Sequence, residues 1–416
     1  MKKTVIELFA GVGGFRVGLN NIKEINNKGI AIENGPWTFV WSNQWEPSTK
    51  KQHAFDCYNT RFPSKHNSNS DISKVDKNKI PNHTLLTGGF PCQDYSVAHS
   101  LKWERGIEGK KGVLWWQINE ILNIKKPPFV LLENVDRLIK SPTKQRGRDF
   151  GIMLRCLCDA GYAMEWRVIN AADYGYPQRR RRIFLFAFNE KTSHYQRIKK
   201  MNAFEVMSKE GIFAKAFPIE KFEKKQLKQY DFLKNYKDLV EVSDKFGATF
   251  ENSGYMIHGK VFTVKTAPIT KNSFILKKLI EKKDVDERFF LNKEKKQKFN
   301  YLRGSKRIPR KHKDGFEYIY SEGAMSSYDS LMKPARTMLT SEGTTNRSTH
   351  IIMDPKKKKL RLLTPIECER INQFPDEWTN TGMPERRRYF MMGNALVCGI
   401  IKKLGEEIST IIDKEA

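Results

Sequence analysis

A cysteine and a glutamate are the residues best suited to act together in catalysis. Cys92 stands in a Gly-Gly-Phe-Pro loop after the apolar segment 85–87, and Glu133 comes just past the apolar segment 129–132. If these segments are parallel strands, both side chains lie at strand carboxyl ends, where ligands bind in open α/β sheets. A thiolate there can act as a nucleophile and a carboxyl group as a proton donor. Taken alone, Cys92 also fits a buried, inert cysteine, and Glu133 a helix-capping carboxylate.

A glycine turn lies in the same expected layer. Gly11-Val-Gly-Gly14 follows the apolar segment 5–10 and precedes a helix-like segment that starts at Phe15. Glycine permits positive φ and lets a ligand approach the backbone closely. The spacing is not GxGxxG, so the NAD fingerprint is weak. From the residues alone, the turn fits a nucleotide site or a plain sharp turn.

An α/β scaffold is expected to position these groups, because apolar strand-like runs alternate with amphipathic segments. From about Asn189 to Lys333 the chain becomes Lys-rich, with interspersed aromatic residues and few periodic runs. We expect a catalytic and cofactor-binding domain from residues 1–188 plus 388–416, and a smaller, irregular domain at 189–387. The expected strands are 5–10, 39–42, 85–87, 129–132 and 183–188, and the expected helices are 114–124, 152–160 and 395–412.

The charge of the 416-residue chain points to a polyanionic partner. The formal net charge is +28, and 39% of the residues are hydrophobic, as in a globular protein. Charge alone does not separate nucleic acid from an anionic membrane surface. No apolar run approaches the roughly 20 residues of a membrane span, and Glu7 interrupts the signal-like start. The six cysteines show no zinc spacing, so we expect no metal site and a cytoplasmic protein.

Five short motifs resemble those of the DNA cytosine-5 methyltransferase family and occur in the family's order. They are the segments 7–15, 88–93 (Gly-Gly-Phe-Pro-Cys-Gln), 133–135 (Glu-Asn-Val), 178–182 (Gln-Arg-Arg-Arg-Arg) and 393–394 (Gly-Asn). Together they span the chain from residue 4 to about 410. The resemblance implies a Rossmann-like, mostly parallel sheet with a target-recognition domain. It also implies methyl transfer from S-adenosylmethionine to carbon 5 of cytosine in double-stranded DNA.

The family chemistry assigns a role to each catalytic candidate. Carbon 5 of cytosine is a poor nucleophile, and a thiolate that adds to carbon 6 activates it. The resemblance makes Cys92 that thiolate and Glu133 the proton donor at ring nitrogen 3. It makes Arg182 the partner of the base's carbonyl oxygen and Arg180 a residue that positions the base. Arg179 and Arg181, which alternate with the other pair along a strand, also fit a phosphate-binding patch.

The resemblance also implies a cofactor pocket. Trp45 and Ile72 would sandwich the adenine, and Asp71 would accept a hydrogen bond from its amino group. Gln44 stands where the family usually has an acidic residue that binds the ribose, and Glu46 is the alternative at that position. Glu7 replaces the more common aspartate. The full expected cofactor set is Phe9, Ala10, Gly11, Gly13, Gly14, Gln44, Trp45, Asp71, Ile72, Leu114 and Asn394.

DNA contacts are expected in two places. The target base must be flipped out of the duplex, and the polar segment 93–112 suits a catalytic loop that closes over DNA, with Ser96 on a phosphate. In the family the variable segment before the last motifs reads the DNA sequence. The expected contact residues are Ser96, Gln178, Arg303, Arg307 and Arg310, although for any single residue a solvated loop is the simpler interpretation.

Other functions remain open from the sequence. A tRNA methyltransferase of the same family would carry Cys-Phe-Thr, and no cysteine here is followed by Phe-Thr. A catalytically inactive DNA-binding relative would lack the nucleophile or the glutamate, and both are present. We expect a monomer that protects host DNA, with a restriction endonuclease that acts on the same site as a possible partner.

Overall fold

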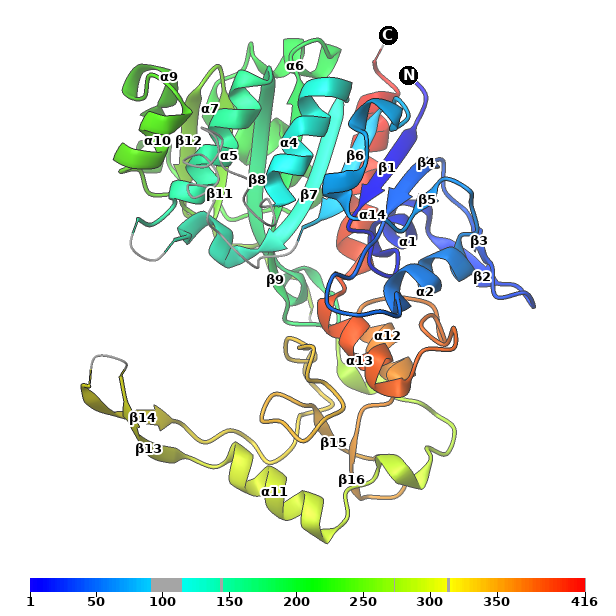
Figure 1. The fold of residues 1–416 in the computed structure, drawn as a ribbon. Helices are drawn as coiled ribbons and strands as arrows, with labels where there is room; N and C mark the ends of the chain where they lie inside the picture. Colours follow the sequence, from blue (N-terminus) through cyan, green and yellow to red (C-terminus); the bar gives the residue numbers. More distant parts are fainter. Residues whose placement is uncertain (91–113, 143–144, 273, 313–314, 416) are drawn as a thin grey trace.

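The computed structural model describes residues 1–90, 114–142, 145–272, 274–312 and 315–415. Its centre is a ten-stranded sheet with the strand order β10-β12-β11-β8-β9-β7-β6-β1-β4-β5 (Figure 1). The strands from β5 to β7 are parallel to one another. Their bounds are β1 Thr4–Leu8, β4 Thr38–Asn43, β5 Asn67–Ser68, β6 Leu85–Gly89 and β7 Phe129–Val135.

The parallel half brings the expected functional segments to one edge. Leu8 pairs with Gly88, and Gly89 pairs with Glu133, so the carboxyl ends of β1, β6 and β7 are level. β1 ends where Phe9 takes a positive φ of 53°, which breaks the extended backbone. The five strands expected from apolar runs are all present, and the α/β, Rossmann-like fold is confirmed.

The other half of the sheet is antiparallel. β9 (Arg181–Asn189) pairs with β7, β8 (Tyr162–Asn170) pairs with β9, and β11 (Ser253–Ile257) pairs with β8. β12 (Lys260–Val264) and β10 (Lys228–Asp231) complete this side.

Three of these strands lie in the range 189–387, where the sequence predicts the small domain. The structure differs there: β10, β11 and β12 extend the central sheet. Each is only four or five residues long, in Lys-rich sequence, so its alternation is too short to stand out.

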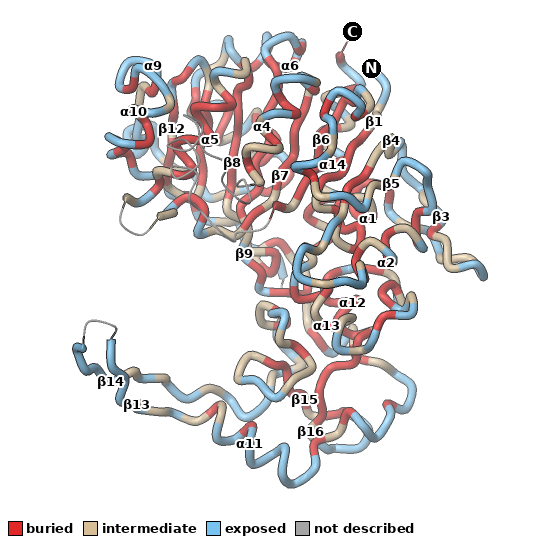
Figure 2. The backbone as a smooth tube through the Cα atoms, viewed as in Figure 1, coloured by how far each residue is buried: buried red, intermediate tan, exposed pale blue. Residues whose placement is uncertain are grey.

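Helices cover both faces of the sheet. α1 (Gly14–Asn20), α8 (Ile212–Ala216) and α14 (Cys398–Ile412) share one apolar core. α4 (Leu114–Lys125), α5 (Arg148–Asp159) and α10 (Leu239–Lys245) share a second core. α14 presents Ile400, Ile401, Leu404, Ile408 and Ile412 at helical spacing, and all are buried. Figure 2 shows the resulting buried sheet between exposed helix faces.

A second lobe lies beyond the carboxyl ends of the parallel strands (Figure 1). Its own small core consists of Leu291, Phe299, Ile351 and Leu362. The β13–β14 ribbon projects from this lobe and is largely exposed (Figure 2). The lobe's elements are α11 Lys293–Arg303, β13 Lys306–Lys311, β14 Glu317–Glu322, β15 Ile351–Met353 and β16 Leu360–Leu362.

Between the lobes lie α12 (Pro365–Ile371) and α13 (Glu385–Asn394). α12 begins at a capping box, in which Thr364 accepts from the backbone of Glu367, with Pro365 in its first turn. No helix in the described ranges is long and apolar enough to cross a bilayer. The remaining elements are α2 His53–Arg61, β2 Ile22–Ile25, β3 Ala31–Glu33, α6 Ser193–Ile198, α7 Ala203–Glu205 and α9 Phe232–Asn235, with the short helix η3 Asp136–Lys140.

Candidate active site

Glu133 and Arg182 form an ion pair at the carboxyl edge of the parallel strands. In the β7–β9 register Arg182 lies opposite Val135, and side chains two residues apart share a face, so Glu133 points to the same side. The Nε of Arg182 lies 2.9 Å from Oε1 of Glu133, and the side chains are 18% and 12% exposed. The pair is therefore shielded from bulk water and still reachable from the edge of the sheet.

Asn134, the middle residue of the Glu-Asn-Val motif, connects β7 to the loop that follows β6. Its Nδ2 donates to the carbonyl oxygen of Phe90 at 2.9 Å, and its Oδ1 accepts from the backbone of Val135 at 2.8 Å. Both groups of the buried amide are thereby used. Cys92 and Ser96 lie outside the described residues, so the structure anchors the start of their loop and does not place their side chains.

Arg180 is buried, with 2% of its surface exposed. It donates to the carbonyl oxygen of Met338 at 3.0 Å, and to those of Gly393 at 3.0 Å and Asn394 at 3.2 Å. Burial, together with the nearby charge of Arg182, lowers the pKa of Arg180 to about 9. Arg180 thus holds the Gly-Asn motif and a segment of the second lobe against β9.

Gln178 is a buried linker in the structure. Its side chain has no exposed surface, and its Nε2 donates to Oδ1 of Asn372 at 3.1 Å. Its backbone bridges to Ala335. Contrary to the expectation, this side chain is not placed to contact DNA, because its buried amide bonds to Asn372 where the two lobes meet.

The glycine turn follows β1 directly. Gly11 and Gly13 have φ values of 56° and 89°, and the N–H of Gly13 donates to the carbonyl oxygen of Ala10 at 2.8 Å. A Cβ built on Gly11 would meet no atom within 4 Å, so the outer side of the turn is open. A Cβ on Gly13 would lie 2.9 Å from the ring of Phe62, so a side chain does not fit there. The backbone of the turn is therefore open to a ligand at Gly11 and closely packed at Gly13.

Gln44 and Glu46 have different partners. The N–H of Gly11 donates to Oε1 of Gln44 at 2.7 Å, which fixes the oxygen of the amide toward the turn. Oε2 of Glu46 accepts from the backbone N–H of Ala54 at 2.9 Å, in the first turn of α2. Glu46 therefore caps a helix, and Gln44 is the residue that faces the glycine turn.

The other expected cofactor residues lie on neighbouring segments. Trp45 is 38% exposed, whereas Ile72 is buried. Asp71 accepts from the backbone N–H of Ser73 at 3.0 Å and caps a short helix. Leu114 begins α4, and exposed Asn394 ends α13.

Backbone and packing contacts bring these segments together at one edge. The N–H of Ala10 donates to the carbonyl oxygen of Asn43, and the N–H of Gln44 donates to that of Ser68, both at 3.0 Å. Gly14 packs closely against Leu396, just after the Gly-Asn motif.

Comparison with known proteins identifies the family of the chain. The model of the C-5 cytosine-specific DNA methylase family matches residues 3–410. The chain belongs to this family. It is 50% identical to the Type II methyltransferase M.Sau3AI of Staphylococcus aureus over 412 residues, which cover 99% of this chain and 96% of that protein.

More distant relatives agree with this assignment. The methylase is 32% identical to the Type II methyltransferase M.HhaI of Haemophilus parahaemolyticus over 183 residues, 44% of this chain and 48% of that protein. Among solved structures, a mutant of the DNMT2 protein of Spodoptera frugiperda superposes with a TM-score of 0.58 at 14% identity. That match covers 98% of this chain and 99% of the other, and it shows a shared fold.

The edge around the glycine turn suits the methyl donor of methyltransferases, S-adenosylmethionine. The open space at Gly11 admits a ligand against the backbone, and the exposed ring of Trp45 offers an apolar face. These observations support the expected cofactor residues of the methylase.

Glu7 is a functional candidate that the sequence reading treated only as a substitution for aspartate. It is fully buried on β1 beneath the glycine turn, where Tyr58 donates to its Oε2 at 3.1 Å. Burial raises the pKa of Glu7 to about 8, which outweighs the hydrogen bonds and the charge of Arg16. An acidic residue inside an apolar strand was the signal in the sequence.

Arg303 is a structural residue, contrary to the expectation of a DNA contact. It is 2% exposed and pairs with Asp329 at 3.0 Å. It also donates to the carbonyl oxygens of Ser326 and Thr349 at 2.8 and 2.6 Å. The partners of its guanidinium group belong to the second lobe, so the three predicted arginines divide into buried Arg303 and exposed Arg307 and Arg310.

Arg307 and Arg310 lie on opposite faces of the β13–β14 ribbon. Arg310 stacks on Tyr320 at 3.9 Å, on the face that also holds the Lys306–Glu322 pair. Arg307 and Lys311 are exposed on the other face and form no ion pair with any described residue. Of the three predicted arginines, Arg307 is thus the most available to DNA.

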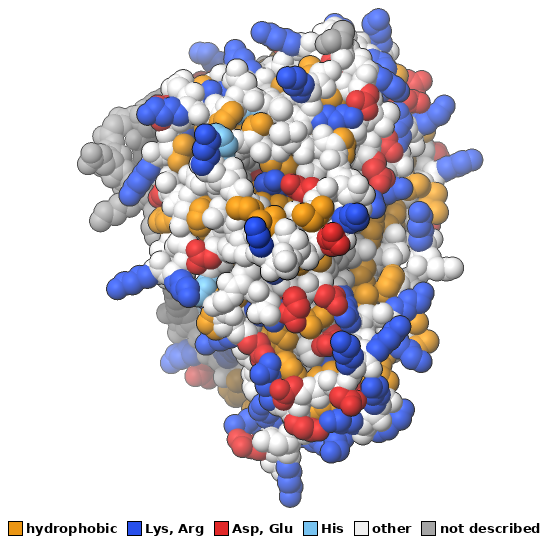
Figure 3. Space-filling view, turned by 90° about the vertical axis from the view of Figure 1, so that its right-hand side faces the viewer, with side chains coloured by type: hydrophobic (Ala, Val, Ile, Leu, Met, Phe, Trp, Pro, Cys, Tyr) orange, Lys and Arg blue, Asp and Glu red, His pale blue; other side chains and the backbone are white. Residues whose placement is uncertain are grey.

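Positive charge is widespread on the methylase. Figure 3 shows lysine and arginine side chains projecting at many points of one face, with acidic side chains among them. Net charge alone therefore does not locate the DNA surface, and local pairing must be compared instead.

Proposed function

We propose that this methylase transfers a methyl group to carbon 5 of a flipped-out cytosine in DNA, with Cys92 as the nucleophile. The Glu133–Arg182 pair carries the proposal, because it stands at the edge where the Cys92 loop leaves β6. The loop is tied to Glu133's own strand by the bond from Asn134 to Phe90. The family match supplies the reaction, and this geometry supports the assignment of roles.

In the proposed reaction the thiolate of Cys92 forms a bond to carbon 6 of the cytosine ring. Glu133 donates a hydrogen bond or proton at nitrogen 3, which relieves the negative charge that the addition places on the ring. S-adenosylmethionine, when bound, would supply an electrophilic methyl group to carbon 5 and would leave as S-adenosylhomocysteine once its methyl–sulfur bond has broken. A base then removes the proton from carbon 5, and the bond between carbon 6 and sulfur breaks to restore the ring and the thiolate.

Arg182 and Arg180 support this chemistry in different ways. Arg182 orients the Glu133 carboxyl through their 2.9 Å contact and can donate to the carbonyl oxygen of the base. Among the described residues, the hydrogen bonds of the Arg180 side chain go to carbonyl oxygens of the protein, so we assign it a positioning role. It keeps the joint between the second lobe and the catalytic edge in place.

The substrate is proposed to be double-stranded DNA bound between the catalytic edge and the second lobe. The target carbon is inaccessible inside a duplex, and flipping the base costs a few kcal/mol. Exposed cations such as Arg307 and Lys311 can supply part of that free energy through phosphate contacts. Both Cys92 and Glu133 are present, which favours an active enzyme over an inactive binding relative.

A role in restriction–modification follows from the likeness to M.Sau3AI, which is a Type II methyltransferase. We propose that the methylase protects host DNA in the cytoplasm against a restriction endonuclease that acts on the same site. A monomer suffices for this role, because the proposed catalytic and cofactor residues all come from one chain.

The test is expression in a host that lacks cytosine methylation, followed by bisulfite sequencing of its DNA. Protected cytosines within one short motif, lost in Cys92→Ser, are the expected result. A folded protein that binds S-adenosylmethionine but protects no cytosine in DNA would contradict the proposal. Assay of tRNA from the same cells would then test the tRNA alternative.

A further inference from the structure

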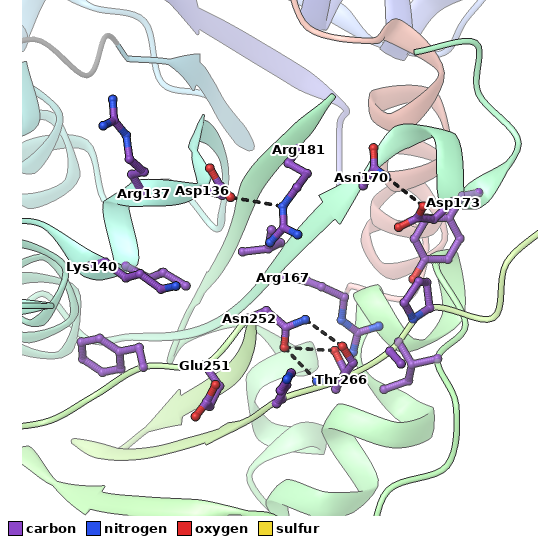
Figure 4. Close-up of a pocket in the computed structure, with 18 residues that line it drawn as sticks. Asp136, Arg137, Lys140, Arg167, Asn170, Asp173, Arg181, Glu251, Asn252 and Thr266 are labelled. Carbon is purple, nitrogen blue, oxygen red and sulfur yellow. Dashed lines mark hydrogen bonds and ion pairs between the residues drawn. The ribbon is translucent and has the colours of Figure 1, made fainter. Parts of the chain in front are cut away.

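A pocket beside the active site is lined by residues that have no part in the proposed reaction. It has a volume of about 410 Å³, and its lining includes Arg137, Lys140, Arg181 and Lys265 (Figure 4). Asp136 and Arg181, which form an ion pair at 3.2 Å, directly adjoin Val135 and Arg182, the opposed residues of β7 and β9. The pocket therefore opens on the same edge of the sheet as the Glu133–Arg182 pair.

The wall opposite η3 comes from the antiparallel half of the sheet. Asn252, just before β11, accepts from the backbone of Thr266 at 2.8 Å and donates to its carbonyl oxygen at 2.8 Å. Arg167 of β8 lies beneath, buried and bonded to Ser253 and to the carbonyls of Phe213 and Phe217. One wall of the pocket thus comes from β8 and from residues beside β11 and β12, strands that the apolar runs of the sequence do not predict.

The carboxylates of the pocket all have partners. Asp136 pairs with Arg181, and Glu251 pairs with Lys228 at 2.6 Å. Asp173 accepts from Nδ2 of Asn170 at 2.8 Å.

The cations are less occupied. Arg137, Lys140 and Lys265 are exposed and form no ion pair with a described residue. The pocket therefore presents uncompensated positive charge, with amide and hydroxyl groups beside it. This is the chemistry that recognises a phosphodiester.

We propose that this pocket binds backbone phosphates of DNA that extends past the target base. The inference rests on the proposed function, because it places the duplex at the edge that holds Glu133. Arg137 and Lys140 lie on η3 on one side of the pocket, and Lys265 follows β12 on the other, so cations line two sides of it. DNA then contacts the large lobe as well as the second lobe, and it is held on both sides of the flipped base.

The test compares two full-length variants with equal loss of charge. Arg137→Ala/Lys140→Ala/Lys265→Ala removes the pocket cations. Lys191→Ala/Lys199→Ala/Lys200→Ala removes three exposed lysines near α6, at the opposite edge of the sheet. Fluorescence anisotropy with a labelled duplex gives Kd over a series of salt concentrations. Each lost phosphate contact reduces the slope of log K against log salt by about 0.9.

We expect the pocket variant to lose a slope of about 2 to 3, and the α6 variant to keep the wild-type slope. Equal changes in the two variants would overturn the proposal, because net charge alone would then explain them. A thermal-shift titration with inorganic phosphate separates the two sources of the anion. If phosphate stabilises the wild type but not the pocket variant, and the DNA slope is unchanged, the pocket binds a free anion and the DNA assignment fails.

Two further controls keep the result interpretable. Lys265→Gln preserves most of the side chain and can be measured if the triple variant does not fold. It is expected to reduce the slope by about 0.9. An unchanged slope in the folded single variant would remove Lys265 from the contact. Bisulfite sequencing of cells that express the wild-type protein tests the proposed reaction separately. Methylation together with an unaltered slope in the pocket variant refutes only the pocket proposal. An altered slope without methylation refutes only the proposed reaction.

Discussion

Arg180, just before β9, and Arg182, within it, lie two residues apart and have opposite environments. Arg180 is enclosed by protein carbonyls, whereas Arg182 pairs with Glu133 at a partly open edge. Arg180→Ala leaves buried carbonyl groups without donors, so we expect a loss of stability of at least about 2 kcal/mol. Urea unfolding measures it. Arg182→Ala is expected to cost less stability than Arg180→Ala in the same assay, because Arg182 lies at a partly open edge, and to lower kcat. Similar stability losses in both would contradict this division.

Glu133→Gln tests the proton donor with little change of shape. The amide oxygen can still accept from Arg182, so the fold should be retained, but the acid is lost. We expect kcat to fall by roughly 10²-fold or more, with little effect on DNA affinity. Single-turnover methylation assays measure the rate. A Glu133→Gln enzyme with wild-type kcat would show that Glu133 supplies no proton.

Gln44 offers a test of the cofactor site. Gln44→Glu keeps an oxygen for the N–H of Gly11 and adds a negative charge that can accept from ribose hydroxyls. We expect severalfold tighter binding of S-adenosylhomocysteine by calorimetry. Glu46→Ala is the matched control, because it removes the bond to Ala54 and should cost about 1 kcal/mol of stability without a change in affinity. Weaker binding in Glu46→Ala alone would reverse the assignment.

Glu7 predicts a pH dependence of stability. Its pKa is raised from 4.5 to about 8, so between these values the folded state retains a proton that the unfolded state has released. Stability should therefore fall as pH rises from about 4.5 to about 8, and this contribution should level off above that. Glu7→Gln removes it, so the difference in unfolding free energy between variant and wild type should grow across this window. A constant difference would refute the raised pKa.

The β13–β14 ribbon should contact DNA through its unpaired face. Arg307→Ala/Lys311→Ala is expected to weaken DNA binding and to reduce the salt slope by about 1.8, without a change in melting temperature. Arg303→Ala, by contrast, should lower the melting temperature, because it breaks the pair with Asp329. Unaltered DNA binding by the folded ribbon variant would exclude this face from the interface.

The sequence predicted the parallel half of the sheet well and the antiparallel half poorly. Apolar runs such as 129–132 are reliable signals of strands buried on both faces. β8 was missed despite its nine residues, because the buried charges Glu165 and Arg167 interrupt its apolar pattern. Both charges have partners that lie far along the chain, the N–H of Ile212 and the carbonyl of Phe213, which no local pattern reveals.

The same limit applies to the candidate site. Motif order located Glu133 and Arg182, whose pairing the structure shows. Residue type alone did not separate exposed Arg307 from buried Arg303, nor did it reveal that Gln178 joins the two lobes. A basic or polar residue within a motif can serve packing or ligand contact, and only tertiary partners distinguish the two.

The packing of α14 on α1 has a consequence for how the enzyme is made. Leu396 lies against Gly14, and Lys3 pairs with Asp413 at 2.7 Å. Residues near position 400 therefore complete the packing beneath the glycine turn. Contacts so distant in sequence form late, after the intervening chain has been synthesised. A nascent polypeptide on the ribosome therefore lacks the complete packing around the glycine turn until α14 has emerged.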